Sequence, residues 1–167
     1  MLRRKKSAAK SGSPSLDAIA LLKADHRQVE QWFEQFSKSR SESKKQRLAN
    51  SICQALTVHT TIEEEIFYPA FIEATRDRDT HHEAVVEHAG AKHLIAEIEE
   101  SGPEDEYFDS KVNVLSEMIK HHVKEEEQAG GMFAEARKSK MDLDALGARL
   151  SERKRELESS GGRREVA

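Results

Sequence analysis

The chain has 167 residues, of which 35% are charged, 37% are hydrophobic and three are proline. A chain of this length can bury the core of one domain without disulfides, and its single cysteine, Cys53, excludes an intramolecular disulfide. No run of about 18 apolar residues and no secretory segment is present, so we expect a soluble, cytoplasmic protein without a membrane partner.

The first 15 residues form a basic segment. Five positive charges fall there, on Arg3, Arg4, Lys5, Lys6 and Lys10, although the net charge of the whole chain is −4. Such an arm could contact nucleic acid or anionic lipid. Because residues 7–15 are small and polar and include Pro14, we interpret residues 1–15 as a disordered tail and do not expect a nucleic-acid partner.

Two long helices are predicted first, over residues 16–37 and 44–74. In the first, buried-type residues recur in steps of three and four, at Ile19, Leu22, His26, Val29, Phe33 and Phe36. In the second, one side carries Leu48, Ile52, Leu56, His59, Glu63, Ile66 and Ala70. We expect Pro69 to kink or loosen the last turn of this helix.

Three further helices are predicted, over residues 81–100, 106–129 and 142–157. The stripe of the first is Val85, His88, Ala91, Ile95 and Ile98, and that of the second is Val112, Leu115, Ile119, His122 and Glu126. Gly102 with Pro103 separates these two helices, and Gly130 with Gly131 ends the second. The short last helix has an apolar edge formed by Leu143, Leu146 and Leu150.

These elements predict an all-α fold. Four helices of such length, joined by short loops, pack as antiparallel neighbours in an up-down-up-down four-helix bundle, here with a short C-terminal fifth helix. We therefore expect a bundle domain over residues 16–136, a helical extension over 137–158 and a disordered tail over 159–167. The two halves of the bundle echo each other, since each supplies one histidine and then an HxxxE pair.

The histidines are the most informative residues of this pattern. His26, His59, His88 and His122 lie on four different apolar stripes, and Glu63 and Glu126 follow two of them by one helical turn. A single histidine on an apolar stripe is more often a hydrogen-bonded core residue than a ligand. Four of them with two carboxylates are costly to bury unless they are paired or bound to metal, so we predict a two-metal site.

Neighbouring residues offer alternatives to this set. His121 also has a glutamate at i+4, but it is rotated by about 100° from His122, which is in line with Leu115 and Ile119. Glu64 and Glu65 rotate off their stripe, and we expect both to be solvated. The absence of thiolate ligands argues against a structural zinc knuckle.

Four stretches resemble the hemerythrin family, specifically its HHE cation-binding branch. They are LLKADHRQVEQWF, HTTIEEEIFYPAF, VEHAGAKHLI and HHVKEEE, and the resemblance spans residues 16–133. It implies a bundle with a non-heme di-iron centre that binds dioxygen, nitric oxide or peroxide, although manganese and zinc accept the same ligands. It further implies that the terminal ligands are His26, His59, His88 and His122, and that the bridging carboxylates are Glu63 and Glu126.

The chain departs from the oxygen-carrying members at one position. Those have a second histidine one turn from the first on the third helix, where this chain has Lys92 at i+4 and Ala84 at i−4. One iron therefore lacks a protein ligand unless His81, His93 or a water molecule fills the place. An open position favours exchange and reactivity over reversible oxygen storage.

Three functions agree with these features. The first is a di-iron protein that binds or reacts with dioxygen, nitric oxide or peroxide in a stress or sensing role. The second is a module that stores, buffers or senses iron or another divalent metal without redox chemistry. The third is a helical interaction protein that uses its basic arm. No catalytic residue and no oligomeric state is predicted.

Overall fold

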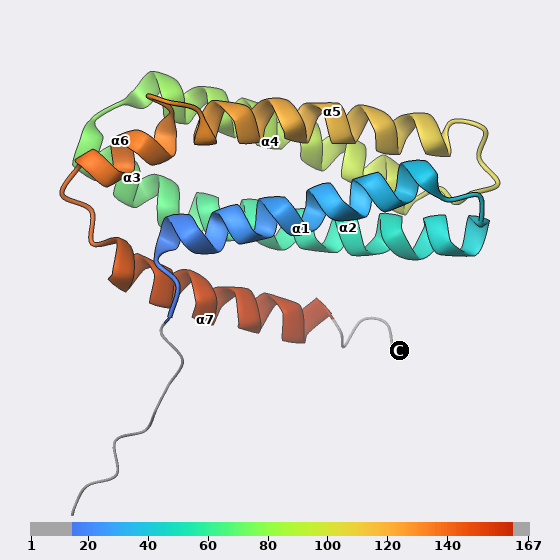
Figure 1. Ribbon diagram of the computed structural model, residues 1–167, viewed down its shortest axis with the longest axis horizontal. Helices are drawn as coiled ribbons and strands as arrows, with labels where there is room; N and C mark the ends of the chain where they lie inside the picture. Colours follow the sequence, from blue (N-terminus) through green and yellow to red (C-terminus); the bar gives the residue numbers. More distant parts are fainter. Residues whose placement is uncertain (1–14, 162–167) are drawn as a thin grey trace, which may run out of the picture.

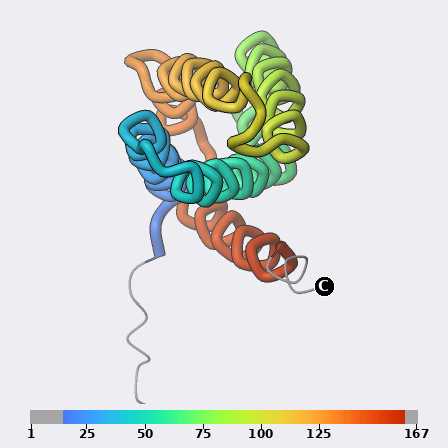
Figure 2. Tube along the Cα trace, turned by 90° about the vertical axis from the view of Figure 1, so that its right-hand side faces the viewer, coloured from blue at the N-terminus to red at the C-terminus, as the bar shows by residue number. Residues whose placement is uncertain are grey.

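The computed structural model describes residues 15–161, and these residues contain helices but no strand (Figure 1). The helices are α1 (Ala18–Lys38), α2 (Glu42–Ile62), the π-helix η1 (Glu63–Phe67), α3 (Tyr68–Thr75), α4 (Arg78–Glu99), α5 (Phe108–Glu127), α6 (Met132–Lys138) and α7 (Leu143–Gly161). The end-on view in Figure 2 shows α1, α2, α4 and α5 around one axis, with α7 outside them. The predicted all-α four-helix bundle with an additional C-terminal helix is confirmed.

Short polar side chains fix where three of the long helices begin. The carboxylate of Asp17 accepts a hydrogen bond from the Ala20 amide at 2.8 Å, and the Asp77 carboxylate does the same for the Thr80 amide at 3.1 Å. The Ser41 hydroxyl caps α2 in the same way. Each cap satisfies an amide that has no partner within its own helix, so each sets the start of a helix at a defined residue.

The predicted helix over residues 44–74 contains an irregular turn. Its backbone runs through α2, η1 and α3 without a break, and the Tyr68 amide donates to the carbonyl of Glu63, five residues earlier. Pro69 has no amide hydrogen to donate to the carbonyl four residues before it, which removes one α-type bond at this place. The irregularity expected at Pro69 is thus a wider turn that precedes the proline.

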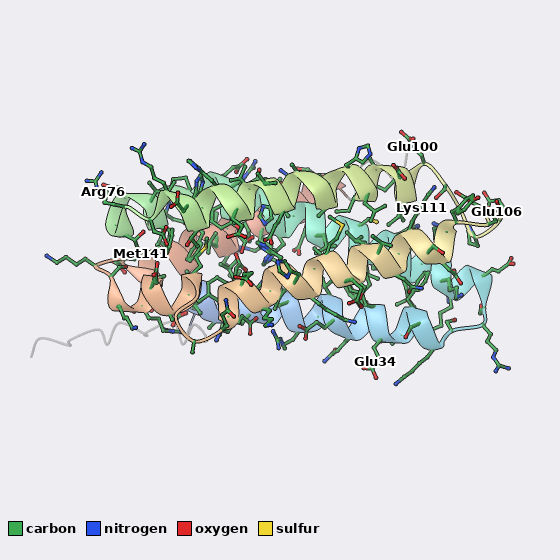
Figure 3. All side chains as sticks on the ribbon, turned by 90° about the horizontal axis from the view of Figure 1, so that it is seen from above. Glu34, Arg76, Glu100, Glu106, Lys111 and Met141 are labelled. Atoms are coloured by element: carbon green, nitrogen blue, oxygen red, sulfur yellow. The ribbon has the colours of Figure 1, made fainter. Side chains whose placement is uncertain are left out.

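Two apolar clusters fill the bundle. One contains Val29, Phe33, Phe36, Ile52, Ile95, Phe108 and Leu115, and the other contains Ile19, Leu22, Ile62, Phe67, Phe71, Met132 and Phe133. His26 falls between Leu22 of one cluster and Val29 of the other. In Figure 3 the bundle is seen from above: Arg76 and Met141 mark one end of it, and Glu100, Lys111 and Glu106 mark the other.

The two C-terminal helices close the molecule. Helix α6, which the sequence pattern did not predict, buries Met132, Phe133 and Ala136. Helix α7 packs against α1 and α2 and reaches Gly161, beyond the predicted end at residue 157. The predicted tails lie outside the described residues except for Ser15 and residues 159–161. Within the described part of the chain, no helix combines the length and the apolar composition that crossing a bilayer requires.

Candidate metal centre

The structure brings together the six side chains that the sequence selects as metal ligands, and we refer to them as the six inner residues. All six are buried: His26, His59, Glu63, His88, His122 and Glu126. Their potential ligand atoms form two overlapping groups, each with all atoms within 4.8 Å of one another. Helices α1, α2, α4 and α5 and the π-helix η1 supply these residues, so the site exists only when the bundle is packed.

The inner atoms divide into two halves that share their carboxylates. In the His26–His59 half, the two Nε2 atoms lie 3.1 Å apart, with Glu63 Oε1 3.2 Å from His59 and Glu126 Oε2 3.3 Å from His26. In the His88–His122 half, the two Nε2 atoms lie 3.2 Å apart. Here Glu63 Oε2 is 3.2 Å from His88, and Glu126 Oε1 is 3.3 Å from His122. Each carboxylate therefore presents one oxygen to each histidine pair.

Each inner histidine also contacts a carboxylate through Nδ1. The pairs are His26 with Glu127 at 2.7 Å, His59 with Asp25 at 3.3 Å, His88 with Glu64 at 2.9 Å and His122 with Glu87 at 2.6 Å. We call these four acids the outer carboxylates. An Nδ1–H that donates outward leaves the lone pair of Nε2 directed inward, which is the form of imidazole that binds a cation.

Glu64 corrects the sequence interpretation, and Glu127 lies in a similar environment. We expected Glu64 to be solvated, but it is half-buried and accepts hydrogen bonds from His88 and Lys92. Glu127 is half-buried as well, against His26. Glu64 directly follows the bridging Glu63 and contacts His88, whereas Glu127 directly follows the bridging Glu126 and contacts His26. Glu65 is exposed, as expected, and pairs with Arg153 on the surface.

Charges are strongly coupled in this interior. Burial lowers the pKa of His59, but the charge of Glu63 and the hydrogen bonds with Asp25 and Glu63 outweigh it and raise that pKa to about 10. Burial raises the pKa of Glu63, yet attraction to His59 and the hydrogen bonds with His59 and His88 hold it well below its usual value. With no metal, the cluster therefore retains protons on imidazole and negative charge on carboxylate.

Two carboxylate oxygens test whether the cluster suits a cation. Glu63 Oε1 and Glu126 Oε2 are buried, and when the histidines are in their metal-binding form, with no proton on Nε2, no described residue donates a hydrogen bond to either oxygen. Both face the His26–His59 half, where two imidazole nitrogens converge on them. A buried anionic oxygen without a donor is costly, whereas a cation bound by two nitrogens and two oxygens removes that cost. The donor set, imidazole and carboxylate without thiolate, fits iron, manganese or zinc.

Tyr68 is a member of the site that the sequence pattern did not indicate. Its hydroxyl lies 3.1 Å from His88 Nε2, 3.3 Å from Glu63 Oε2 and 3.2 Å from Glu126 Oε1. Burial, together with the charges of Glu63 and Glu126, raises its pKa well above the usual value, so the hydroxyl keeps its proton. Tyr68 follows Glu63 by five residues, and a side chain at that spacing lies on the same helix face only in a π-turn. A predicted π-turn at this place would therefore have indicated Tyr68.

The residues that could have supplied a further histidine ligand lie elsewhere. His93 is exposed and pairs with Glu97, while Lys92 pairs with Glu64 outside the cluster. The ring of His81 packs edge-on against Tyr68, with 5.7 Å between centroids. His121 is exposed and contacts Glu87, so His122 is the inward member of that pair. None of these residues lies as close to His88 Nε2 as the hydroxyl of Tyr68, at 3.1 Å.

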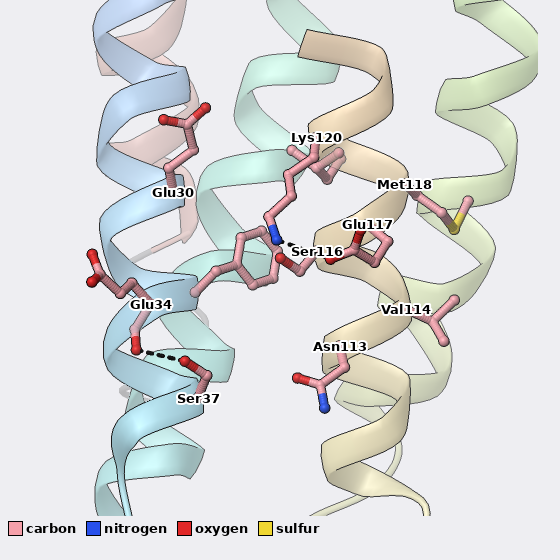
Figure 4. A pocket seen from close by; sticks show the side chains of 11 residues that line it. Glu30, Glu34, Ser37, Asn113, Val114, Ser116, Glu117, Met118 and Lys120 are labelled. Carbon is pink, nitrogen blue, oxygen red and sulfur yellow. Dashed lines mark hydrogen bonds and ion pairs between the residues drawn. The ribbon is translucent and has the colours of Figure 1, made fainter. Parts of the chain in front are cut away.

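A small apolar cavity adjoins the four histidines. It has a volume of about 20 Å³, and its apolar walls are Val29, Leu56, Ile119 and Val123. A second cavity of about 100 Å³ lies between α4 and α5 and extends from His121 past Met118 to His88 and His122. A larger hollow, about 670 Å³ between α1 and α5, is lined by none of the six inner residues (Figure 4).

Known proteins resemble this chain in sequence and fold. Residues 17–133 match the family described as Hemerythrin HHE cation binding domain. A DNA nickase from Nostoc sp. is 29% identical over 133 residues, which are 78% of this chain and 37% of that protein, so the chain spans about a third of that relative's length. The crystal structure of a Hemerythrin HHE cation binding domain-containing protein from Mycobacterium kansasii superposes with a TM-score of 0.73. The two share 21% identity, with 87% of this chain and 89% of that chain covered, so the likeness is one of fold.

Proposed function

Because the chain belongs to the hemerythrin family through its HHE cation-binding domain, we propose that it holds two iron ions and that it binds or reacts with dioxygen, nitric oxide or peroxide. Metal binding is the property of the family, and the buried cluster fits a metal site. The six inner residues are the proposed ligands, with Glu63 and Glu126 as bridges. We further propose a stress or sensing role in the cytoplasm.

The division of the carboxylate oxygens carries this proposal. Glu63 and Glu126 each present one oxygen to the His26–His59 half and one to the His88–His122 half. One ion alone would leave two of these four oxygens facing a histidine pair without a cation. Two ions satisfy all of them, and carboxylate-bridged pairs in helical bundles are a common form of di-iron site.

The protein's own groups would control what reaches the centre. A pair of iron ions supplies the redox chemistry that binding or reduction of these small molecules requires. The outer carboxylates keep each histidine oriented, and the 20 Å³ cavity leaves space for a molecule of only a few atoms. The Tyr68 hydroxyl holds a proton within 3.3 Å of both bridging carboxylates, beside the His88–His122 half.

Metal analysis followed by spectroscopy tests this function. Protein prepared with little metal is titrated anaerobically with Fe²⁺ and then exposed separately to dioxygen, nitric oxide and peroxide. We expect two ions per chain and a new optical band with at least one of the three ligands. Glu63→Gln should reduce the ion count, whereas Glu65→Gln, a change at an exposed neighbour, should leave it unchanged. A wild-type protein that binds no iron would refute the proposal.

The same experiment separates the competing functions. Two bound ions without any optical response would favour a storage, buffering or sensing module that lacks redox chemistry. The hypothesis of an interaction protein that uses the basic arm concerns residues outside the described part of the chain. We do not extend DNA nicking to this chain, because the match covers 37% of the Nostoc protein.

A further inference from the structure

Three of the four outer carboxylates are themselves held by a cationic side chain. Arg27 binds Glu127 at 2.6 Å, Lys92 binds Glu64 at 2.6 Å, and Lys154 binds Asp25. Arg27 and Lys92 belong to α1 and α4, within the bundle. Lys154 belongs to α7, which begins after residue 133, where the family match ends. One histidine of the centre, His59, therefore depends on a contact from outside the matched domain.

The packing of α7 places Lys154 at this position. Leu146 and Leu150 are buried with residues of α1, α2 and η1. Gly147 allows the close approach, because a Cβ atom there would lie 2.3 Å from the carbonyl oxygen of Leu16. Lys154 follows Gly147 by seven residues and Leu150 by four, so it lies on the same face of α7 as the docked residues. That face brings its amino group to Asp25.

We propose that α7 is part of the metal centre, and that Lys154 acts through Asp25 as a positioning residue for His59. It thereby sets how tightly the His26–His59 half holds its ion. This inference rests on the proposed function. In the other half, the outer carboxylates Glu64 and Glu87 are contacted by Lys92 of α4 and His121 of α5, so that among the described residues both contacts come from within the bundle. The two halves are thus supported differently, and α7 acts on only one of them.

The geometry at Asp25 explains why the lysine matters. Lys154 occupies Oδ1 and leaves Oδ2 for His59 Nδ1, so the two contacts fix the rotation of the carboxylate. The bond to His59 is 3.3 Å, the longest of the four outer bonds. Asp25 retains only 14% side-chain exposure, so water can replace the lysine only in part. Removal of the ammonium group frees the carboxylate to turn away from His59.

The neighbouring residue Arg153 offers a matched control. It lies on the same helix and pairs with Glu65 at 2.7 Å and Glu156 at 3.1 Å, neither of which contacts an inner histidine. We compare Lys154→Met, Lys154→Arg and Arg153→Met with the wild type. Lys154 is 30% exposed, so the methionine variant should fold, and circular dichroism checks this. Fe²⁺ is the probe, with affinities measured anaerobically by competition with a chromophoric chelator.

Two readouts decide the outcome. In Lys154→Met we expect one of the two ions to bind about 10- to 100-fold more weakly, with the other unchanged. In the metal-free protein, the ¹⁵N chemical shift of His59 Nδ1–H, which donates to Asp25, should move towards the value of an imidazole without a carboxylate partner. Lys154→Arg should restore both properties, and Arg153→Met should alter neither.

Three results would overturn or redirect this inference. Equal losses in Lys154→Met and Arg153→Met would mean that α7 acts only by packing. An unchanged His59 signal in metal-free Lys154→Met would refute the positioning role. If the wild type binds no Fe²⁺, the proposed function fails, but the metal-free spectrum still decides whether Lys154 positions His59.

Discussion

Metal binding should release protons, and the effect should be large at neutral pH. An imidazole binds a cation only through a nitrogen that carries no proton, so the ion competes with the protons of the cluster. In the metal-free protein the pKa of His59 is raised to about 10, and the pKa values of His26 and His122 are raised as well. At pH 7, therefore, an ion must displace at least the proton of His59.

The size of this effect follows from linkage. Each displaced proton changes the affinity up to tenfold per pH unit, about 1.4 kcal/mol, as long as the pH lies below the pKa of the group. Because the pKa of His59 is about 10, the affinity for the ion in the His26–His59 half should rise up to about 100-fold between pH 7 and pH 9. An unperturbed histidine, with a pKa near 6.5, would give almost no change over this range.

The stability of the metal-free protein should change in the opposite direction. The raised pKa of His59 contributes stability that is complete below its ordinary value of 6.5 and is lost as the pH rises towards about 10. The lowered pKa of Glu63 contributes stability that is present above pH 4.5 and is lost as the pH falls through that lowered value. The contribution of these two groups is therefore greatest between pH 4.5 and 6.5.

Calorimetry and thermal unfolding provide the measurements. Titration with Fe²⁺ at pH 8, in two buffers of different ionisation enthalpy, counts the protons released per ion. Thermal unfolding is measured between pH 6.5 and 9. The melting temperature of the metal-free protein should fall as the pH rises, and the difference between the melting temperatures of the loaded and the metal-free protein should grow. Absence of proton release at pH 8, together with an affinity independent of pH, would refute this account of the cluster.

Three substitutions test other parts of the structure. Tyr68→Phe removes the buried hydroxyl that donates its one hydrogen to the bridging carboxylates, so urea denaturation of the metal-free protein should show a loss of about 1–3 kcal/mol. Glu63→Ala removes a bridge, and elemental analysis should find at most one ion per chain, whereas Glu65→Ala retains two. Leu150→Ala opens a cavity where α7 docks and should cost about 2–5 kcal/mol in the same denaturation assay, and a loss below 0.5 kcal/mol would show that α7 is loosely attached.

The helices and the six inner residues could be predicted because their pattern is local. Residues three and four apart share a helix face, so His26 and His88 were recognised from their apolar neighbours alone. The same constant step misplaced Ala70 and missed Tyr68. The wider turn of η1 shifts the helix face by one residue, so that Tyr68 is buried and Ala70 is only half-buried. Nothing in a 3.6-residue period indicates such a shift.

The outer carboxylates depend on how the helices pack, which a stripe on one helix does not reveal. Asp25 directly precedes His26, yet it contacts His59 on the next helix. Glu87 precedes His88 in the same way and contacts His122. The sequence does show an acid directly before His26 and before His88, and a second glutamate directly after Glu63 and after Glu126. The histidine that each of these acids contacts is set by the packing of neighbouring helices. Lys154 lies 129 residues from Asp25, so its role was even further from any local pattern.

The attachment of α7 has a consequence for the order in which the chain folds. The halves α1–α2 and α4–α5 are hairpins of neighbouring helices, whose contacts are local and form quickly. The contact between Asp25 and Lys154 closes a loop of 129 residues and therefore belongs to the slow, late events. During synthesis, α1 leaves the ribosome long before α7 exists. A nascent chain can thus assemble its bundle early, but the surroundings of His59 become complete only after α7 has also been made.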